Sequence, residues 1–158
     1  MEINQLMTRK AVPEDANEIF GVLQQSFKKY CDLSGLDYTV DALKESVEDI
    51  LVDMAVKHML VTVYEGRIIG TLRLEIRSDH TAYLTRFGVL PDFHRMGVGQ
   101  ALMEKADEWL QQAGVKKVCL HTAAKNKDLV RFYYARGFYV ESTNTDRGYL
   151  RVFMVKDY

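Results

Sequence analysis

The chain has 158 residues, of which 47% are apolar and 27% are charged, and its formal net charge is −1. This composition is that of a globular domain, and the lack of a positive excess argues against a basic nucleic-acid binder. Two cysteines, Cys31 and Cys119, are too few for a disulfide framework or a structural zinc site and fit a reducing compartment. No stretch has the ~20 apolar residues of a membrane span, and residues 1–10 lack a signal-peptide core. We therefore expect one cytoplasmic domain over residues 1–158, without nucleic-acid or membrane partners.

The first half of the chain predicts an edge strand, two helices and an antiparallel meander. Residues 5–10 read as a short strand, and Pro13 with two following acids opens a helix. Residues 31–39 are polar, contain Gly35, and are expected to form a loop. The helical faces are Ala16, Ile19, Phe20, Leu23 and Phe27 for the first helix, and Leu43, Val47, Ile50, Leu51 and Met54 for the second. The expected strands are residues 59–64, 67–77 and 81–89, with a tight turn at Glu65-Gly66.

Alternation in the second of these strands predicts one buried face and one face in water. Leu72, Leu74 and Ile76 are expected to be buried, and Arg73, Glu75 and Arg77 are expected to be solvated.

The strand that ends at Pro91 is followed by a short loop, H-R-M-G-V-G, and then at once by a helix. The apolar spacing of that helix continues to Ala113, and Gly114 stands where a left-handed residue would end it. This succession directs several backbone N–H groups and the positive end of a helix dipole at one point beyond the strand. Gly97 and Gly99 let the backbone approach that point closely, which suits a diphosphate.

The second half predicts a crossover and two closing strands. Residues 117–122 read as a strand that is parallel to residues 81–89, through a right-handed connection. Asn126 can cap the next helix, which ends at Gly137, and residues 139–145 and 149–156 are the last strands. The fold class is therefore α/β, an α+β mixed sheet of six or seven strands flanked on both faces by about four helices.

Two further features concern the same region. Gly88, just before the end of its strand, suggests a bulge or a close backbone approach that would separate this strand from the one ending near His121. The segment N-K-D-L-V-R-F-Y-Y-A-R-G-F, residues 126–138, places Asn126 and Tyr133 two turns apart on one helical face.

Together, V89-L-P91 with H94-R-M-G97-V-G99, and Asn126 with F132-Y133 and G137-F138, resemble the GNAT superfamily of acetyl-CoA-dependent N-acetyltransferases. Two linked motifs at this separation are a stronger signal than a lone glycine loop. The resemblance covers residues 67–138 well and the remainder in outline. It departs from the family pattern at His94, where Arg or Gln is usual, and at Leu129, where alanine is usual. Thr85 occupies the place of a common glutamate base, so the general base is left unassigned.

The resemblance implies how acetyl-CoA is held. Its diphosphate would lie on the N–H groups of residues 95–100, and its pantetheine arm would pair with residues 87–89 and bond Asn126. Tyr133 would lie near the thioester sulfur. The implied cofactor-binding residues are Phe87, Gly88, Val89, His94, Arg95, Met96, Gly97, Val98, Gly99, Gln100, Asn126 and Tyr133.

The expected reaction is direct attack of a primary amine on the thioester, without a metal. An ordinary alkyl amine has a pKa of ~10.4, so a base helps to form its neutral state. The Val89 N–H can donate to the carbonyl oxygen, and Tyr133 can protonate the leaving thiolate. The acceptor stays open between small amines, amino acids, antibiotics and proteins. Because proteins of this family often form dimers, the resemblance also implies a possible homodimer, although the sequence does not show which residues would form its interface.

Each assignment has an ordinary structural alternative. The two loop glycines could serve a turn, Tyr133 could be a core aromatic, and Glu75 and His121 could be structural rather than substrate contacts. Arg86, Arg147 and Arg151 could be surface charges or a cluster that binds an acidic group of the substrate. A non-catalytic acyl-CoA-binding module is the rival function, supported by Thr85. A dinucleotide-binding domain is disfavoured because the G-x-G-x-x-G spacing and its acidic partner are missing.

Overall fold

The computed structural model describes residues 5–158, which form a seven-stranded mixed sheet of order β1-β2-β3-β4-β5-β7-β6. Residues 1–4, which belong to the terminus expected to lack a signal peptide and to the expected single domain, lie outside the described residues. The strands are β1 (Met7–Lys10), β2 (His58–Tyr64), β3 (Arg67–Ile76), β4 (Thr81–Val89), β5 (Lys117–Ala123), β6 (Tyr139–Asn144) and β7 (Arg151–Asp157). No helix among the described residues is long and apolar enough to cross a membrane.

The described residues also contain five α-helices and two short 3-10 helices, so the expected sheet with helices on both faces is confirmed. The helices are η2 (Pro13–Asp15), α1 (Ala16–Ser34), α2 (Asp41–Lys44), α3 (Val47–Val56), η3 (Pro91–Phe93), α4 (Val98–Gln112) and α5 (Lys127–Ala135). A Cβ built on Gly88 would meet Ser26 of α1, whereas one on Gly70 would meet Val98 and Leu102 of α4. Gly70 pairs with Val89 and therefore lies on the same face as Val89, whereas Gly88, the preceding residue of β4, lies on the other face. α1 and α4 therefore cover opposite faces of the sheet.

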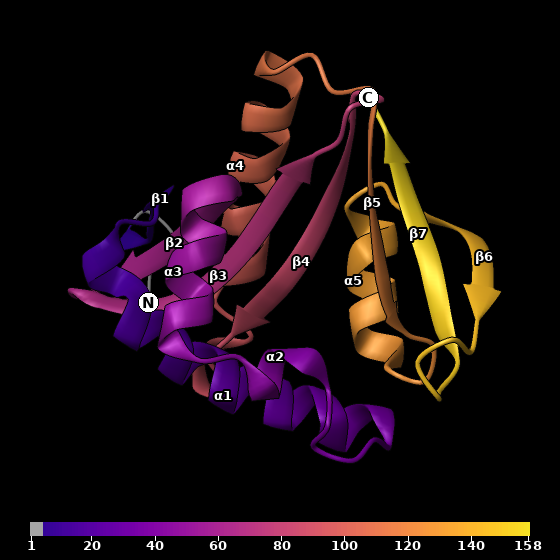
Figure 1. Cartoon of the computed structure of the whole chain (residues 1–158), viewed down its shortest axis with the longest axis horizontal. Coiled ribbons are helices and arrows are strands. Elements are labelled where there is room, and N and C mark those ends of the chain that lie inside the picture. Colours follow the sequence, from indigo (N-terminus) through magenta and orange to yellow (C-terminus); the bar gives the residue numbers. More distant parts are fainter. Residues whose placement is uncertain (1–4) are drawn as a thin grey trace.

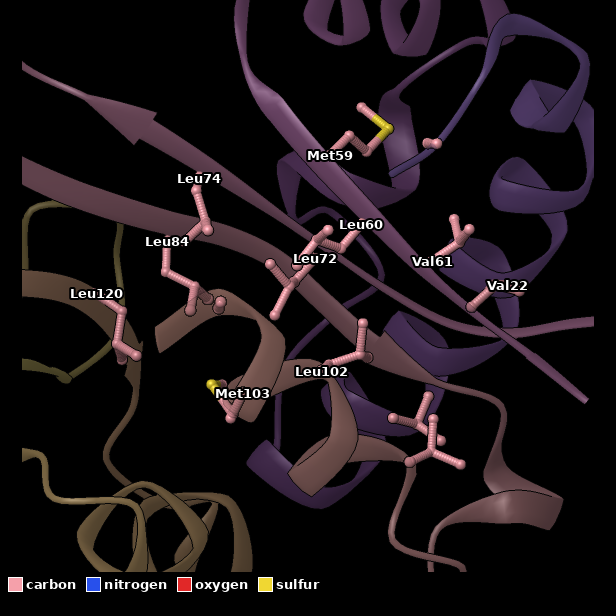
Figure 2. Close-up of a cluster of buried hydrophobic side chains, with 14 of the residues drawn as sticks. Val22, Met59, Leu60, Val61, Leu72, Leu74, Leu84, Leu102, Met103 and Leu120 are labelled. Atoms are coloured by element: carbon pink, nitrogen blue, oxygen red, sulfur yellow. The ribbon is translucent and has the colours of Figure 1, made fainter. Parts of the chain in front are cut away.

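The core lies between the sheet and these two helices. Figure 2 shows side chains of β2, β3, β4 and β5 together with Leu102 and Met103 of α4 and Val22 of α1. Each of these apolar side chains is buried. Removal of apolar surface from water stabilises the fold by roughly 25 cal/mol per Å² and is the main favourable contribution to folding. The apolar spacing of the glycine-loop helix is thus explained by core packing.

β4 and β5 are the parallel pair that the crossover predicted, but they pair only over Thr81–Tyr83 and Lys117–Cys119. Figure 1 shows the two strands close together at one end and diverging toward the other, where α1 and α2 lie. Of the residues that the sequence assigns to the site, the glycine loop follows this divergence, and Arg86, Phe87, His121 and Tyr133 line it. The splay between strands, inferred from Gly88, is therefore confirmed.

Three local expectations are wrong. α1 continues through Cys31 to Ser34, both buried, and ends at Gly35 with φ 68°, so packing extends the helix into the expected loop. The expected second helix is divided into α2 and α3 because Ser46 forms a capping box with Asp49 and starts a new helix.

The third error concerns β3, where Arg73 is completely buried rather than solvated. Its guanidinium forms ion pairs with Glu45, which follows α2, and with Asp53 of α3, at 2.8 Å from the Asp53 carboxylate. Ile76, expected to be buried, is 39% exposed near the end of the strand. α3 and the segment before it cover the face that the alternation assigns to water, and they supply the counter-charges that a buried arginine requires.

Candidate active site

The divergence of β4 and β5 opens a cavity of about 560 Å³. Its walls come from α1, the segment between α1 and α2, both strands, α5 and the loop between β6 and β7. Aromatic side chains form much of the lining, namely Phe27, Tyr30, Tyr83, Phe87, Tyr133 and Tyr149. The size and the mixture of aromatic and polar groups are typical of a small-molecule site.

A bulge in β4 creates the divergence. Thr71 of β3 pairs with Gly88, but the next paired residues are Arg73 and Thr85, so two residues of β4 face one residue of β3. One of the two, Arg86, has φ 53°, a left-handed conformation that is uncommon for a non-glycine residue. The bulge therefore lies immediately before Gly88, and it is consistent with the bend of β4 away from β5.

The backbone of Val89 faces the opened side of β4. The N–H of Leu90 donates to Ile69 of β3 over 2.9 Å, and backbone groups alternate direction along an antiparallel strand. The N–H and C=O of Val89 are thus directed toward β5, which has separated by this point. The C=O accepts a hydrogen bond from Nε2 of His94 over 2.8 Å, so His94 secures the end of the strand. The Val89 N–H is directed into the space between the strands.

The N-terminus of α4 lies just beyond this strand end and has no side-chain cap and no acid in its first turn. By contrast, Ser46 caps α3 and Asn126 caps α5. Gly97 is the N-cap residue, with φ 79°, a conformation that favours glycine. The first N–H groups of α4 are therefore presented without a competing side chain, as an anion-binding helix terminus requires.

The two other glycines of the motif are required by packing. A Cβ on Gly99 would lie 3.1 Å from both Phe132 and Phe87, whose rings stack with centroids 5.5 Å apart. A Cβ on Gly88 would lie 2.3 Å from Oγ of Ser26. Gly99 thus packs closely on Phe87 of β4 and Phe132 of α5, and Gly88 on α1, so that a larger side chain at either glycine would displace these neighbours. Of the other loop residues, Val98 is buried, Met96 packs partly on the core, Arg95 is exposed, and Gln100 bonds Glu104 on the helix surface.

Asn126 is the N-cap of α5 and Tyr133 lies within that helix. The side-chain oxygen of Asn126 accepts a hydrogen bond from the Leu129 N–H over 3.3 Å, which confirms the expected cap. Its amide NH₂ remains as a donor. Tyr133 is buried against Phe87 and Phe138 and lines the cavity. Burial raises the pKa of Tyr133 above its usual value near 10, and neighbouring Tyr30 adds to the effect, so the phenol stays protonated.

His121 lies on the wall formed by β5, and its Nδ1 is hydrogen-bonded to the hydroxyl of Tyr83 on β4. Its ring also packs on Phe153 with centroids 4.8 Å apart. Burial lowers the pKa of His121 below its usual 6.5, and the positive charges of Arg151, Arg147 and Arg77 lower it further, against Asp146. The imidazole is therefore neutral at neutral pH.

Two other predicted substrate contacts are placed differently. Glu75 lies outside the cavity lining, 3.8 Å from both Lys57 and Arg77. Arg86 does line the cavity, but its guanidinium is paired with Glu45 at 3.2 Å. Thr85 also lines the cavity, and the carboxylates among the described lining residues are the exposed Asp37 and Asp41.

Sequence reasoning missed Tyr30 and Tyr83 as part of this site. The Tyr30 hydroxyl accepts a hydrogen bond from the Ala123 N–H over 2.9 Å and so bridges α1 to the end of β5. Tyr83 meets His121 only because β4 and β5 pair with Tyr83 opposite Cys119. The predicted parallel crossover indicated that these two strands are neighbours, but it did not specify which of their residues lie opposite each other.

Comparison with known proteins agrees with this geometry. The model of the acetyltransferase (GNAT) family matches residues 23–138. An aminoalkylphosphonate N-acetyltransferase of Salmonella typhimurium is 26% identical over 135 residues, covering 82% of each chain. A spermidine N(1)-acetyltransferase of Thermoplasma acidophilum is 24% identical over 145 residues, covering 86% of this chain and 89% of its own.

Among solved structures, the PaiA N-acetyltransferase of Thermoplasma acidophilum in complex with coenzyme A has the same fold. Its TM-score is 0.85 at 24% identity, over 97% of this chain and 99% of that one. The family match spans the bulged strand, the uncapped helix and the helix that carries Tyr133. The chain therefore belongs to the GNAT acetyltransferase family and is an acetyl-CoA-dependent N-acetyltransferase.

Proposed function

We propose that this enzyme transfers the acetyl group of acetyl-CoA to a primary amine by direct attack of the amine on the thioester. The observation that carries the proposal is the convergence of the uncapped α4 N-terminus, the Val89 N–H and Tyr133 where β4 leaves β5. Acetyl-CoA supplies the activated acyl group, and the chain supplies its binding, orientation and proton transfer.

The residues present fit coenzyme A. The first N–H groups of α4 and the loop before it would bind the diphosphate, since the first turn of α4 carries no acidic side chain that would repel a negative charge. The amide NH₂ of Asn126 is a donor for the extended pantetheine arm, and the outward-facing Val89 N–H is the donor for the thioester carbonyl at its end. His94 already occupies the Val89 C=O, so Val89 offers the bound thioester a donor and no free acceptor.

Tyr133 is proposed as the donor to the departing sulfur. Its burial keeps the phenol protonated, and a buried donor is more effective than one in water. The same burial disfavours complete transfer of the proton from the phenol to the thiolate, because it raises the pKa of Tyr133 further above that of a thiol, which is ordinarily ~8.5. Tyr133 would therefore act mainly by hydrogen bonding to the developing thiolate, while the Val89 N–H donates to the oxygen of the attacked carbonyl.

His121 is proposed as the general base in place of the carboxylate that Thr85 does not supply. When its Nδ1–H donates to the Tyr83 hydroxyl, Nε2 keeps a lone pair that can accept the proton of the amine. A lowered pKa keeps this lone pair available at neutral pH. Tyr83 would hold the tautomer and orient the ring.

Thiol release from acetyl-CoA across a panel of amines tests the proposal. We expect turnover in the wild-type enzyme and a kcat about 10²- to 10⁴-fold lower in Tyr133→Phe, with the Kd for acetyl-CoA nearly unchanged. Tyr134→Phe is the matched control, since Tyr134 is the next residue and is 52% exposed. Binding of acetyl-CoA without turnover of any amine would favour the non-catalytic module instead, and equal activity of Tyr133→Phe would remove Tyr133 from the reaction.

A further inference from the structure

The cavity that is proposed to receive the amine is lined by more positive than negative side chains. The cations are Lys44, Arg86, Arg147 and Arg151, and the acids are Asp37 and Asp41. Such a lining repels a polycation and attracts an anion. The charge of an acceptor is therefore a property on which this site can discriminate.

Most of these charges are already compensated or lie in solvent. Arg86 is paired with Glu45 at 3.2 Å, and Arg147 is paired with Asp41 at 2.7 Å. Lys44 and Asp37 are exposed to solvent.

Arg151 is different, because it is partly buried and no ion pair forms to it from the described residues. Its Nε is buried and has no hydrogen-bond partner within residues 5–158. A partly buried guanidinium without a counter-charge is unfavourable unless an anion joins it.

The register of β5 and β7 places Arg151 beside the proposed base. Arg151 pairs with Ala123, and Phe153 pairs with His121. Paired residues, and residues two apart on one strand, share a face, so Arg151 lies diagonally next to His121. Its charge acts on His121 and on Tyr83, which agrees with this placement.

We propose that the acceptor is a small primary amine that carries an anionic group, a carboxylate or a phosphonate, a few atoms from the nitrogen. Arg151 binds the anion through its planar guanidinium while the amine lies against His121. The inference rests on the proposed function, because it assigns the substrate of the same site. It disfavours polyamines, whose second ammonium group would meet Arg151.

The test measures kcat/KM for four amines of similar size with wild-type enzyme. We expect 2-aminoethylphosphonate and β-alanine to exceed propylamine, which carries no second charged group, by about tenfold or more, and 1,3-diaminopropane to be the poorest acceptor. The two anionic amines also separate the two sources of the charge, since the better one identifies phosphonate or carboxylate as the preferred group.

Arg151→Gln should remove the preference, so that the ratio of kcat/KM for each anionic amine to kcat/KM for propylamine falls to near one. Lys105→Gln is the matched control, because it removes one positive charge from α4 outside the cavity. Arg151→Lys should retain part of the preference, since it keeps the charge without the planar fork.

The outcomes separate the two proposals. Turnover of propylamine or diaminopropane as fast as the anionic amines would overturn the acidic-acceptor inference and leave the acetyltransfer mechanism standing. Turnover of none of the amines, with acetyl-CoA bound, would overturn the proposed function and the inference with it. The preference of the wild-type enzyme decides the inference even where Arg151→Gln fails to fold.

Discussion

The phenol oxygen of Tyr30, in α1, accepts a hydrogen bond from the backbone N–H of Ala123, at the end of β5, over 2.9 Å. The two residues are 93 positions apart, and the bond crosses the opening where β4 and β5 no longer pair. A helix on one side of the sheet thus replaces part of the missing strand pairing.

Tyr30→Phe should therefore destabilise the protein, because the buried Ala123 N–H loses its partner. We expect a loss of about 1–3 kcal/mol in the free energy of unfolding, measured by urea denaturation. Tyr134→Phe, at an exposed tyrosine, should change it by less than about 0.5 kcal/mol. Equal stability of the two variants would show that the Tyr30 bond does not hold the opened edge.

The N-cap of α4 allows a second test that separates backbone strain from ligand binding. Gly97 and Gly114 stand at the two ends of α4 with φ of 79° and 75°, so valine at either position is strained by a similar amount. Both variants should lose about 1–2 kcal/mol or more of stability. Only Gly97→Val should also weaken acetyl-CoA binding, because its side chain would crowd the proposed diphosphate site.

Isothermal titration with acetyl-CoA at a temperature where both variants are folded measures the difference. We expect at least a tenfold increase in Kd for Gly97→Val and an almost unchanged Kd for Gly114→Val, where a Cβ meets nothing within 4 Å. A similar Kd in both variants would contradict the placement of the diphosphate at this loop.

The sequence was most informative where structure is local. The strand, glycine loop and helix around Gly97 follow from periodicity, and so do the cap at Asn126 and the crossover to β5. Cofactor geometry depends largely on these local features, which explains why its residues could be proposed before the fold was known.

The errors arise where a distant segment decides the environment. Arg73 alternates with leucines and reads as solvated, yet Glu45 and Asp53 approach it from other elements and bury it. The acceptor side of the cavity has the same origin, since Tyr30 and Tyr83, which sequence reasoning missed, come from α1 and β4. Their meeting depends on strand register and helix placement, which periodicity does not encode.

The proposed base gives the reaction a defined pH dependence. The pKa of His121 is lowered below 6.5, so His121 loses its proton at a lower pH than free histidine does. Below that pKa the imidazole is protonated and cannot accept a proton, so kcat should fall as the pH falls through a value below 6.5. Above it the base is fully available, and this limb should level off.

The charged groups that face His121 determine in which direction a substitution shifts its pKa. Arg151, Arg147 and Arg77 lower its pKa, whereas Asp146 raises it. Arg147→Gln should therefore move the acidic limb of the kcat profile to higher pH. His121→Gln should abolish the acidic limb of the kcat profile and lower kcat at pH 7.5 by about 10²-fold or more. Ionisation of the amine substrate affects all variants alike and so does not account for a difference between them. An unchanged limb in His121→Gln would exclude His121 as the base.

The contact between β4 and α1 at the bulge gives the last prediction. A Cβ on Gly88 would lie 2.3 Å from Oγ and 3.1 Å from Cβ of Ser26, so Gly88→Ala forces α1 and the bulge apart. We expect a loss of about 1–3 kcal/mol in the free energy of unfolding, measured by urea denaturation.

The Ser26 hydroxyl is buried without a hydrogen-bond partner in residues 5–158, so its removal should cost little in itself. Ser26→Gly combined with Gly88→Ala should then be more stable than the sum of the two single changes predicts, despite about 1 kcal/mol for glycine in a helix. Gly21→Ala, in the same helix with nothing within 4 Å, is the control and should be neutral or stabilising. Strict additivity of the Ser26 and Gly88 changes would show that the two residues are not in contact.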